Sequence, residues 1–280
     1  MNRFEAFRAL HRAGRPLFLP NAWDRASAAA LAARGFPAIG TTSLGVAAAA
    51  GLPDAAGATR ETTLWLARDL AALPVLVSVD IEGGFGATPE DVAELATDLE
   101  RLGVAGVNIE DGRPGGAGLT DAALQCELIS AMKRTAPGLF VNARTDTYWL
   151  GTAEDNRAAD RAEETRRRAA AYLAAGADGI FVPGLADASA TAALAAGLDA
   201  PLNVLLPPDG PGLSRLAALG VSRVSTGSLL FRAALHAALD TAGRALRGTP
   251  LPAGLPSYAD AQRLAAAYAP GETRRPGRPG

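Results

Sequence analysis

The chain has 280 residues, of which 49% are hydrophobic, and its net charge at pH 7 is −2. This length is typical of a single α/β barrel, and the hydrophobic fraction is large enough to fill its core. The weak negative charge argues against a nucleic-acid partner, which would require a basic excess gathered on one face.

Three further absences narrow the class of protein. No run of about 18 uncharged apolar residues occurs, which excludes a transmembrane helix and a membrane partner. Residues 1–5 lack the apolar core of a signal peptide, so we expect a cytoplasmic protein. Cys126 is the sole cysteine, which rules out an internal disulfide and a cysteine-based metal cluster.

Residues suited to general-base or Schiff-base catalysis are scarce. The chain has two histidines, His11 and His236, and one lysine, Lys133. We expect His11 in an amphipathic N-terminal helix, His236 deep in a C-terminal helix and Lys133 late in a central helix. A Schiff-base mechanism needs a lysine at a strand end inside a pocket, and none is expected there. Catalysis must therefore rest on carboxylates, arginines, hydroxyl groups and a metal.

A local pattern recurs along the chain, in which glycine follows an alanine- and leucine-rich helical stretch and precedes a β-branched run. It occurs at residues 35–39, 103–107, 176–180 and 220–224. The glycine is expected to end a helix in the left-handed conformation, and the next residues resemble strands buried on both faces. Together with similar runs, the pattern predicts eight strands, at residues 17–20, 38–42, 75–80, 105–110, 139–144, 178–182, 202–206 and 223–226.

Helical patterns fill the intervals between these strands. They lie at residues 27–34, 59–72, 89–102, 121–135, 153–175 and 228–246, with one more at 255–268. Eightfold alternation of strand and helix favours a parallel (β/α)8 barrel of the TIM type over an open doubly wound sheet. We therefore expect one barrel domain over residues 1–269. Residues 270–280, rich in proline, glycine and arginine, are expected to form a disordered tail.

Acidic residues gather where the predicted strands end, which is where parallel barrels carry their functional residues. Asp80 and Glu82 follow the third strand, and Glu110 ends the fourth. Arg144 and Asp146 follow at the end of the fifth. Because Asp80 and Glu82 are two residues apart, an extended strand would point both side chains to the same side.

Converging carboxylates repel one another unless protons or a cation intervene. Oxygen ligands without histidine or cysteine select Mg2+, or its close substitute Mn2+, and Mg2+ usually keeps several water ligands. The alternative is that these acids cap helices, as we expect of Asp24 and Asp121. Acids on neighbouring strand ends, followed by an arginine on the next, favour the metal site.

Two features at the same edge are suited to an anionic ligand. Arg144 offers a planar fork for a carboxylate or a phosphonate. The turn formed by Thr42, Ser43 and Leu44 can direct backbone N–H groups toward a second anionic oxygen. We therefore predict that a small-molecule carboxylate or phosphonate substrate binds beside the metal.

Taken in order, these motifs resemble those of the isocitrate lyase/phosphoenolpyruvate mutase superfamily. The likeness rests on TSLG at 42–45 with GLPD at 51–54, VDIEGGFG at 79–86, GVNIED at 106–111 and ARTD at 143–146. The resemblance covers nearly the whole predicted barrel. It implies a (β/α)8 fold, often with the last barrel helix exchanged between subunits, and therefore a homo-oligomer, either a dimer or a tetramer.

The resemblance also implies how the metal would be held. Asp80 would contact Mg2+ most directly, whereas Asp54, Glu82 and Glu110 would hold it largely through water. The superfamily acts on 2-oxo or 2-hydroxy acids, and its reactions break or form C–C or C–P bonds through an enolate.

The substrate-binding residues follow from the same resemblance. Thr42, Ser43 and Leu44 would bind carboxylate or phosphonate oxygens, and Arg144 would anchor a carboxylate. Arg232 matches an arginine that lies near the substrate in the lyases.

Several departures separate the chain from the specialised members. The lyases carry a Lys-Lys/Arg-Cys-Gly-His loop after the fourth strand, where this chain has GRPGGAGL at residues 112–119. The Lys-Thr-Asn-Ser run of the mutases is also absent. Glu82 replaces the usual aspartate and Asp146 replaces a glutamate. The chain is most similar to the carboxyphosphonoenolpyruvate phosphonomutase-like group.

Three functions are consistent with these residues. The favoured one is a Mg2+-dependent lyase or decarboxylase that cleaves a C–C bond of a small 2-oxo or 2-substituted dicarboxylic acid through a metal-stabilised enolate. The second is a phosphonomutase or phosphonate hydrolase acting on a C–P bond. Such an enzyme must hold or receive a phosphoryl group, and only Arg113, the backbone of residues 112–118 and Asn108 are near enough to do so. The third is a non-catalytic barrel that binds a small acid. The residues expected to carry catalysis are Asp54, Glu110, Arg144 and Asp146.

Overall fold

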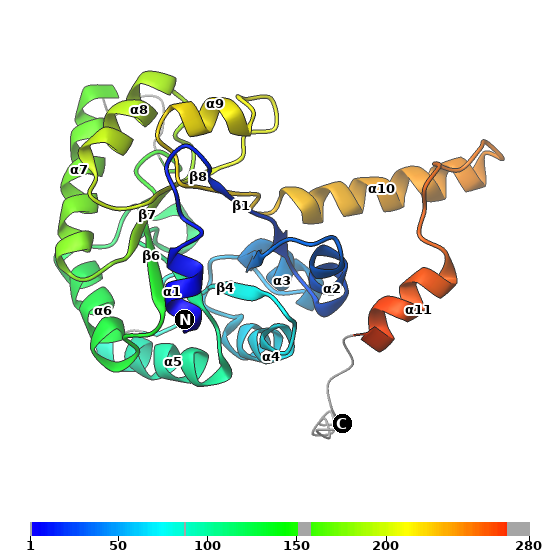
Figure 1. Ribbon diagram of the computed structural model, residues 1–280, viewed down its shortest axis with the longest axis horizontal. Helices are drawn as coiled ribbons and strands as arrows, with labels where there is room; N and C mark the ends of the chain where they lie inside the picture. The colour runs from blue at the N-terminus through cyan, green and yellow to red at the C-terminus, as the bar shows by residue number, and fades with distance from the viewer. Residues whose placement is uncertain (1, 87, 151–157, 268–280) are drawn as a thin grey trace.

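The computed structural model describes residues 2–86, 88–150 and 158–267. Its strands pair in parallel as one sheet in the order β1-β9-β8-β7-β6-β5-β4-β3-β2. The two outer strands, β1 (Leu17–Leu19) and β2 (Asn21–Ala22), follow one another in the chain with Pro20 between them. β1 pairs with β9 and β2 pairs with β3, so the sheet forms a barrel (Figure 1). The predicted fold class is confirmed.

The first barrel strand differs from its predicted bounds of 17–20. It is interrupted at Pro20 and continues to Ala22. Proline has no N–H group to donate to a strand ladder, which explains the interruption. Its carbonyl still accepts a hydrogen bond from the Gly40 N–H at 2.9 Å, so the two short strands act as one wall of the barrel.

The other strands lie where the sequence predicts them. Gly103 and Gly176 have φ values of 87° and 105°, as expected of glycines that end helices in the left-handed conformation. Every residue of β3, β5 and β7 is buried, which agrees with strands covered on both faces. The strands are β3 (Ala38–Thr41), β4 (Leu76–Asp80), β5 (Gly106–Glu110), β6 (Phe140–Arg144), β7 (Gly179–Val182), β8 (Leu202–Leu205) and β9 (Arg223–Ser225).

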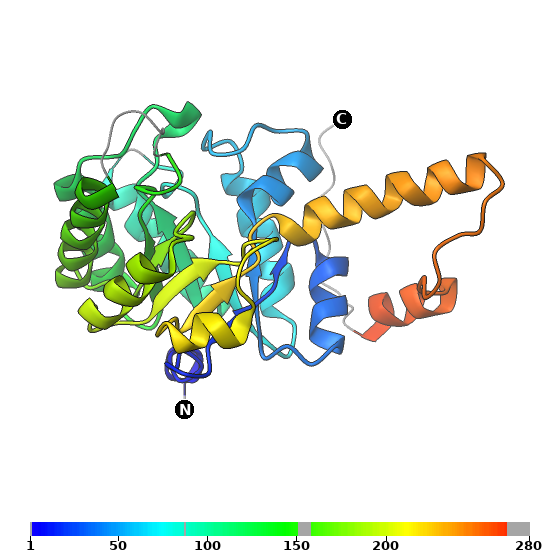
Figure 2. The same ribbon diagram turned by 90° about the horizontal axis from the view of Figure 1, so that it is seen from above.

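Helices follow the strands and surround the barrel (Figures 1 and 2). Asp24 and Asp121 cap two of them, as predicted, by accepting backbone hydrogen bonds from Ser27 and Ala123 at 2.7 Å. The helices are α1 (Arg3–Arg8), α2 (Arg25–Ala33), α3 (Ser43–Ala50), α4 (Arg60–Ala71), α5 (Pro89–Leu102), α6 (Ala122–Thr135), α7 (Ala158–Ala174), α8 (Ala188–Gly197), α9 (Leu213–Ala218), α10 (Leu229–Leu246) and α11 (Tyr258–Ala267).

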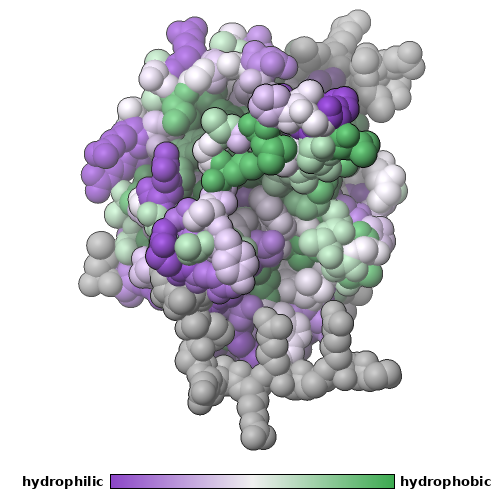
Figure 3. Space-filling model, turned by 90° about the vertical axis from the view of Figure 1, so that its right-hand side faces the viewer, coloured by the Kyte–Doolittle hydropathy of each residue, from purple (hydrophilic) through white to green (hydrophobic). Residues whose placement is uncertain are grey.

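The last two helices depart from the compact barrel. α10 extends away from it, and α11 turns back to contact α2 (Figure 2). Large apolar side chains on α10 are open to solvent, with Leu239 at 75% and Leu246 at 89% exposure. Figure 3 views the molecule from this side and shows hydrophobic residues gathered on its surface. An unpartnered apolar face of this kind marks a candidate interaction surface.

Two predictions fall partly or wholly outside the described residues. These are the tail at 270–280 and the first residues of the helix predicted at 153–175. None of the helices that the structure describes is both long and apolar enough to cross a membrane.

The N-terminal segment covers the end of the barrel where the strands begin. The prediction that His11 lies within a helix is wrong, because α1 ends at Arg8. The His11 ring instead stacks on Phe140 with centroids 4.6 Å apart and meets Phe7 edge-on at 4.8 Å. Burial, assisted by the nearby charge of Arg223, lowers the pKa of His11 from 6.5 to about 3.

This environment predicts an acid-sensitive fold. In the unfolded chain His11 binds a proton below pH 6.5, whereas in the folded chain it does so only near pH 3. The contribution of neutral His11 to stability is therefore complete above pH 6.5 and is lost as the pH falls toward 3. Between pH 7 and pH 5 this single group should lower the free energy of unfolding by about 2 kcal/mol.

Urea unfolding of the wild type and of His11→Gln at both pH values tests this expectation. The variant should lose about 2 kcal/mol less than the wild type between pH 7 and pH 5. Arg12→Gln, which alters an exposed residue next to His11 and leaves the imidazole in place, serves as the matched control and should lose as much as the wild type. Equal losses for all three proteins would show that His11 does not cause the acid sensitivity.

Candidate functional site

A cavity of about 310 Å³ lies at the carboxyl ends of the barrel strands. β4, β5, β6 and β7 each contribute side chains to its wall, together with the N-terminus of α3. Of the ten predicted site residues, eight line the cavity: Thr42, Ser43, Leu44, Asp54, Asp80, Glu110, Arg144 and Asp146.

Strand register explains why these side chains meet. Asp80 on β4 pairs with Asn108 on β5, and Glu110 on β5 pairs with Arg144 on β6. Asn108 and Glu110 are two residues apart on one strand, so both point to the same side of the sheet. The two register pairs therefore form two successive levels of polar groups beneath the cavity mouth.

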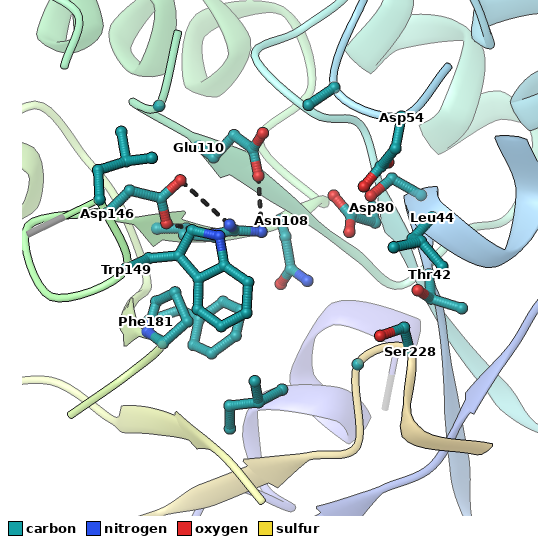
Figure 4. A pocket seen from close by; sticks show the side chains of 18 of the residues that line it. Thr42, Leu44, Asp54, Asp80, Asn108, Glu110, Asp146, Trp149, Phe181 and Ser228 are labelled. Carbon is teal, nitrogen blue, oxygen red and sulfur yellow. Dashed lines mark hydrogen bonds and ion pairs between the residues drawn. The ribbon is translucent and has the colours of Figure 1, made fainter. Parts of the chain in front are cut away.

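The Arg144 guanidinium is held by two protein carboxylates. Its Nη1 lies 2.6 Å from Glu110 Oε2, and its Nε and Nη2 donate to the Asp146 carboxylate at 2.6 and 3.0 Å. Figure 4 shows these interactions as dashed lines that converge from Glu110 and Asp146. Burial disfavours the cation, but the charges of Glu110 and Asp146 raise the pKa of Arg144. The predicted anion anchor is thus already engaged by the protein's own acids.

The site carries more buried negative charge than this arginine neutralises. Burial raises the pKa of Glu110 to about 8 although Arg144 opposes the change, and the charge of Asp80 adds to the rise. Burial also raises the pKa of Asp80, with a further contribution from Asp54. The pKa of Asp146 is raised for the same reason. A proton or a bound cation would relieve this repulsion.

The arrangement of the acids fits a hydrated divalent cation. Among residues 2–86, 88–150 and 158–267, no three Asp, Glu, His or Cys side chains form a ready-made metal cage. Asp54, Asp80 and Glu110 instead face the same cavity from separate elements (Figure 4). Because Mg2+ keeps several waters and contacts one or two carboxylates directly, separate acids around one cavity suit it.

Glu82 does not occupy the expected position. β4 ends at Asp80, and Glu82 has a left-handed backbone with φ of 51°, so the alternation argument that placed both side chains together is wrong. Its carboxylate accepts hydrogen bonds from the Thr59 hydroxyl at 2.6 Å and the Gly57 N–H at 3.0 Å. Glu82 therefore holds the loop that follows Asp54, and its role beside a metal stays a prediction.

Arg232 lies apart from the cavity of its own chain. It occupies the first turn of α10, where its side chain is exposed. Because α10 leads away from the barrel, this arginine points into solvent rather than toward Asp80.

A buried network beside the cavity was not foreseen from the sequence. Asp111 is fully buried and accepts the Asp146 N–H at 2.8 Å. Its other oxygen accepts the Tyr172 hydroxyl at 2.6 Å and Arg168 Nη1 at 3.1 Å, and Arg168 also donates to the Thr120 carbonyl at 2.9 Å. Asp111 thus ties α7 and the end of the 112–119 loop to the backbone of Asp146. The only sequence signal was an aspartate directly after a strand end.

The 112–119 loop forms one rim of the cavity. Gly112 and Leu119 pair as an antiparallel bridge, and the Arg113 N–H donates to the Gly118 carbonyl at 2.9 Å. A side chain at Gly112 would collide with the Asp146 carboxylate, so glycine is required at this close approach. Arg113 lines the cavity mouth with an exposed side chain.

Comparisons with known proteins agree with this geometry. Residues 7–246 match the family described as phosphoenolpyruvate phosphomutase. MT2054, an uncharacterized protein of Mycobacterium tuberculosis (strain CDC 1551 / Oshkosh), is 44% identical over 92% of this chain and 95% of its own length. A solved protein of Burkholderia cenocepacia J2315 is 36% identical, with a TM-score of 0.83 over 96% of this chain and 98% of that one.

Relatives with named activities show the chemistry of the wider superfamily. A 2-methylisocitrate lyase of Halalkalibacterium halodurans is 34% identical over 71% of this chain and 65% of the lyase. An oxaloacetate decarboxylase of Ectopseudomonas mendocina is 35% identical over 61% of this chain and 58% of the decarboxylase. A phosphonopyruvate hydrolase that was solved with oxalate and Mg2+ is 24% identical and shares the fold, with a TM-score of 0.81 over 95% of this chain and 96% of that one. The chain belongs to the phosphoenolpyruvate phosphomutase family, within the isocitrate lyase/phosphoenolpyruvate mutase superfamily.

Proposed function

We propose that this protein is a Mg2+-dependent lyase or decarboxylase. It would cleave a C–C bond of a small 2-oxo or 2-substituted dicarboxylic acid through an enolate. The observation that carries the proposal is the group of acids beside a small cavity, where burial raises the pKa values of Asp80 and Glu110 and neighbouring carboxylates add to the rise. Residues with strongly shifted pKa values in a cleft are typical of active sites.

Asp80, Asp54 and Glu110 are the residues that would hold the cation, and Mn2+ would substitute for Mg2+. When bound, the ion supplies Lewis-acid stabilisation of negative charge on the substrate oxygens. The same acids would hold the ion at the wall of the cavity that the substrate enters.

The start of α3 is suited to one end of the substrate. Its N-cap, Thr42, makes no side-chain hydrogen bond to the helix, so the N–H groups of its first turn lack partners within the helix. A backbone hydrogen bond from Ser43 already favours the ionised form of Asp80. The neighbouring N–H of Leu44 can donate to a substrate carboxylate, since helix N-termini favour anions.

Arg144 would bind the second carboxylate of the substrate in place of the Glu110 side chain. A substrate carboxylate can replace Glu110 at Nη1, while Asp146 continues to hold the opposite side of the guanidinium. Glu110 would then be free to interact with a hydrated cation. After bond cleavage, the enolate carbon must receive a proton. Because Asp146 stays paired with Arg144, a water held beside its carboxylate would supply that proton.

A phosphonomutase or phosphonate hydrolase is the second candidate. It is favoured by Arg113, which lines the cavity mouth and forms no ion pair within the part of the chain that the structure describes. A free guanidinium at this place could bind a phosphonate. The C–C lyase is preferred because no side chain beside Arg113 is a good phosphoryl acceptor.

A turnover screen tests the proposal. The wild type with Mg2+ would be incubated with oxaloacetate, 2-methylisocitrate, dimethylmalate and phosphonopyruvate, and consumption of each would be measured. At least one carboxylic acid should be consumed, and chelation of Mg2+ should stop the reaction. Asp80→Ala should reduce the rate by about 100-fold or more, because metal stabilisation of the transition state is worth several kcal/mol.

Asp98→Ala provides the matched control, since this aspartate lies on the surface of α5 in a weak ion pair with Arg101. It should react as fast as the wild type. Equal rates for the wild type and Asp80→Ala would contradict the site assignment. Consumption of phosphonopyruvate alone would favour the second candidate, and binding without any turnover would indicate a non-catalytic acid-binding barrel.

We also propose that the protein forms a homo-oligomer through α10. Its leucines at 235, 239 and 246 are exposed on a helix that extends away from the barrel. Exposed apolar surfaces of this kind usually lie at protein interfaces. Arg232 at the base of the same helix would then be carried toward a neighbouring subunit, which would account for its distance from its own cavity.

Light scattering after gel filtration tests the oligomer. The wild type should have at least twice the 28.5 kDa mass of one chain. Leu239→Glu should shift it toward the monomer, because the substitution places a charge in a buried apolar contact. Leu213→Glu, on the exposed face of α9, should leave the mass unchanged. A monomeric wild type would contradict the proposal.

A further inference from the structure

Arg223 on β9 lies in the interior of the barrel, beneath the cavity. Its side chain is fully buried. Nη2 donates to Asn108 Oδ1 at 3.1 Å and to Ser78 Oγ at 3.5 Å, and Nε donates to Ser225 Oγ at 3.3 Å. No carboxylate of the described residues lies within ion-pair distance of it.

A buried arginine without a paired carboxylate is costly for the fold. Burial lowers the pKa of Arg223 to about 9, and the charge of Asp80 opposes this change, so the group remains a cation at neutral pH. Removing a charge from water without pairing it destabilises a protein. Residues that break such a rule concentrate at functional sites, which points to a role for the groups that Arg223 contacts.

The hydrogen bonds of Arg223 fix the orientation of the Asn108 amide. A guanidinium can only donate, so Asn108 must present its oxygen to Arg223. The same oxygen accepts a second hydrogen bond, from Asn142 Nδ2 at 2.9 Å. If the amide were flipped, its NH2 group would face two donors and both bonds would be lost. The Asn108 nitrogen is therefore turned away from Arg223 and Asn142.

That nitrogen faces the cavity. Asn108 is only 4% exposed, yet it contributes to the cavity wall. It is the register partner of Asp80 and lies two residues before Glu110 on the same strand. Figure 4 shows its amide extending into the space between Glu110, Asp80 and Ser228. The Asn108 amide N–H is thus a donor that lies among the acids of the site and makes no hydrogen bond to the protein atoms that the structure describes.

We propose that Asn108 contacts the substrate, and that its amide N–H donates to an anionic oxygen of the bound acid. Arg223 is the positioning residue that holds the amide in this orientation. Because a fixed donor requires an acceptor, the site favours a ligand that presents an oxygen at this position over one that presents a hydrogen-bond donor. The inference deepens the proposed function, on which it rests only for the nature of the ligand.

Calorimetric titration with oxalate at saturating Mg2+ tests the donor. Asn108→Ala should weaken oxalate binding by about 10- to 100-fold, as expected for a lost hydrogen bond to a charged group. Its affinity for Mg2+ alone should stay within about threefold of the wild type, because the amide oxygen is turned away from the cation. Asn108→Asp should weaken oxalate binding further, since it replaces the donor with a second negative charge.

The matched control is Gln125→Ala, which removes a buried amide from α6 outside the cavity. It should bind oxalate as tightly as the wild type. Any loss of stability common to buried amides would appear in this variant as well.

A double-mutant cycle separates positioning from a merely structural role. Arg223→Met should weaken oxalate binding, yet the double variant with Asn108→Ala should bind no more weakly than Asn108→Ala alone. Arg223→Lys keeps a cationic donor for the Asn108 oxygen and should restore most of the affinity, which also provides a folded variant if Arg223→Met does not fold.

Three results would overturn the inference. These are wild-type affinity in Asn108→Ala, additive losses in the double variant, and a wild type that does not bind oxalate with Mg2+. Failure of the proposed function would look different. If the predicted binding pattern is found but none of the substrates is consumed, Asn108 and Arg223 keep their roles and only the lyase activity is rejected.

Discussion

The ion pair between Arg144 and Glu110, 2.6 Å apart, is the interaction on which the site depends. It joins the ends of β5 and β6, where the two residues are register partners, and it occupies the guanidinium that would otherwise be free to bind a ligand. Even with this pair, burial and mutual repulsion raise the pKa values of Glu110 and Asp80. The cavity therefore has a shortage of positive charge, which a bound cation can supply. It also contains an arginine, Arg144, that can bind a substrate carboxylate in place of Glu110.

The surrounding scaffold fixes this arrangement from two directions. Beside the cavity, Asp111 holds the backbone of Asp146 and is itself held by α7. Below the cavity, Arg223 sets the direction of the Asn108 amide. Both networks consist of buried groups that accept or donate hydrogen bonds across distant segments. Such preorganised polar groups stabilise charge without having to rearrange during a reaction.

The sequence predicted the barrel well because strand and helix patterns are local. It also predicted that Asp80, Glu110 and Arg144 lie together, since the carboxyl ends of parallel strands must meet at one edge. It failed at Glu82, whose direction depends on a backbone with φ of 51° and on partners more than 20 residues earlier in the chain. The pairing of Asp111 with Tyr172 was equally inaccessible, because it joins residues 61 positions apart. Local patterns therefore locate strand ends, whereas the direction of each side chain depends on contacts distant in sequence.

The central claim is that the cavity binds a divalent cation and an anionic acid together. Titration calorimetry of Mg2+ in the absence and presence of oxalate tests it most directly. The account predicts that oxalate strengthens Mg2+ binding by about tenfold or more, and that Mg2+ strengthens oxalate binding by the same factor, as thermodynamic linkage requires. Equal Mg2+ affinities with and without oxalate, or no binding of either, would contradict it.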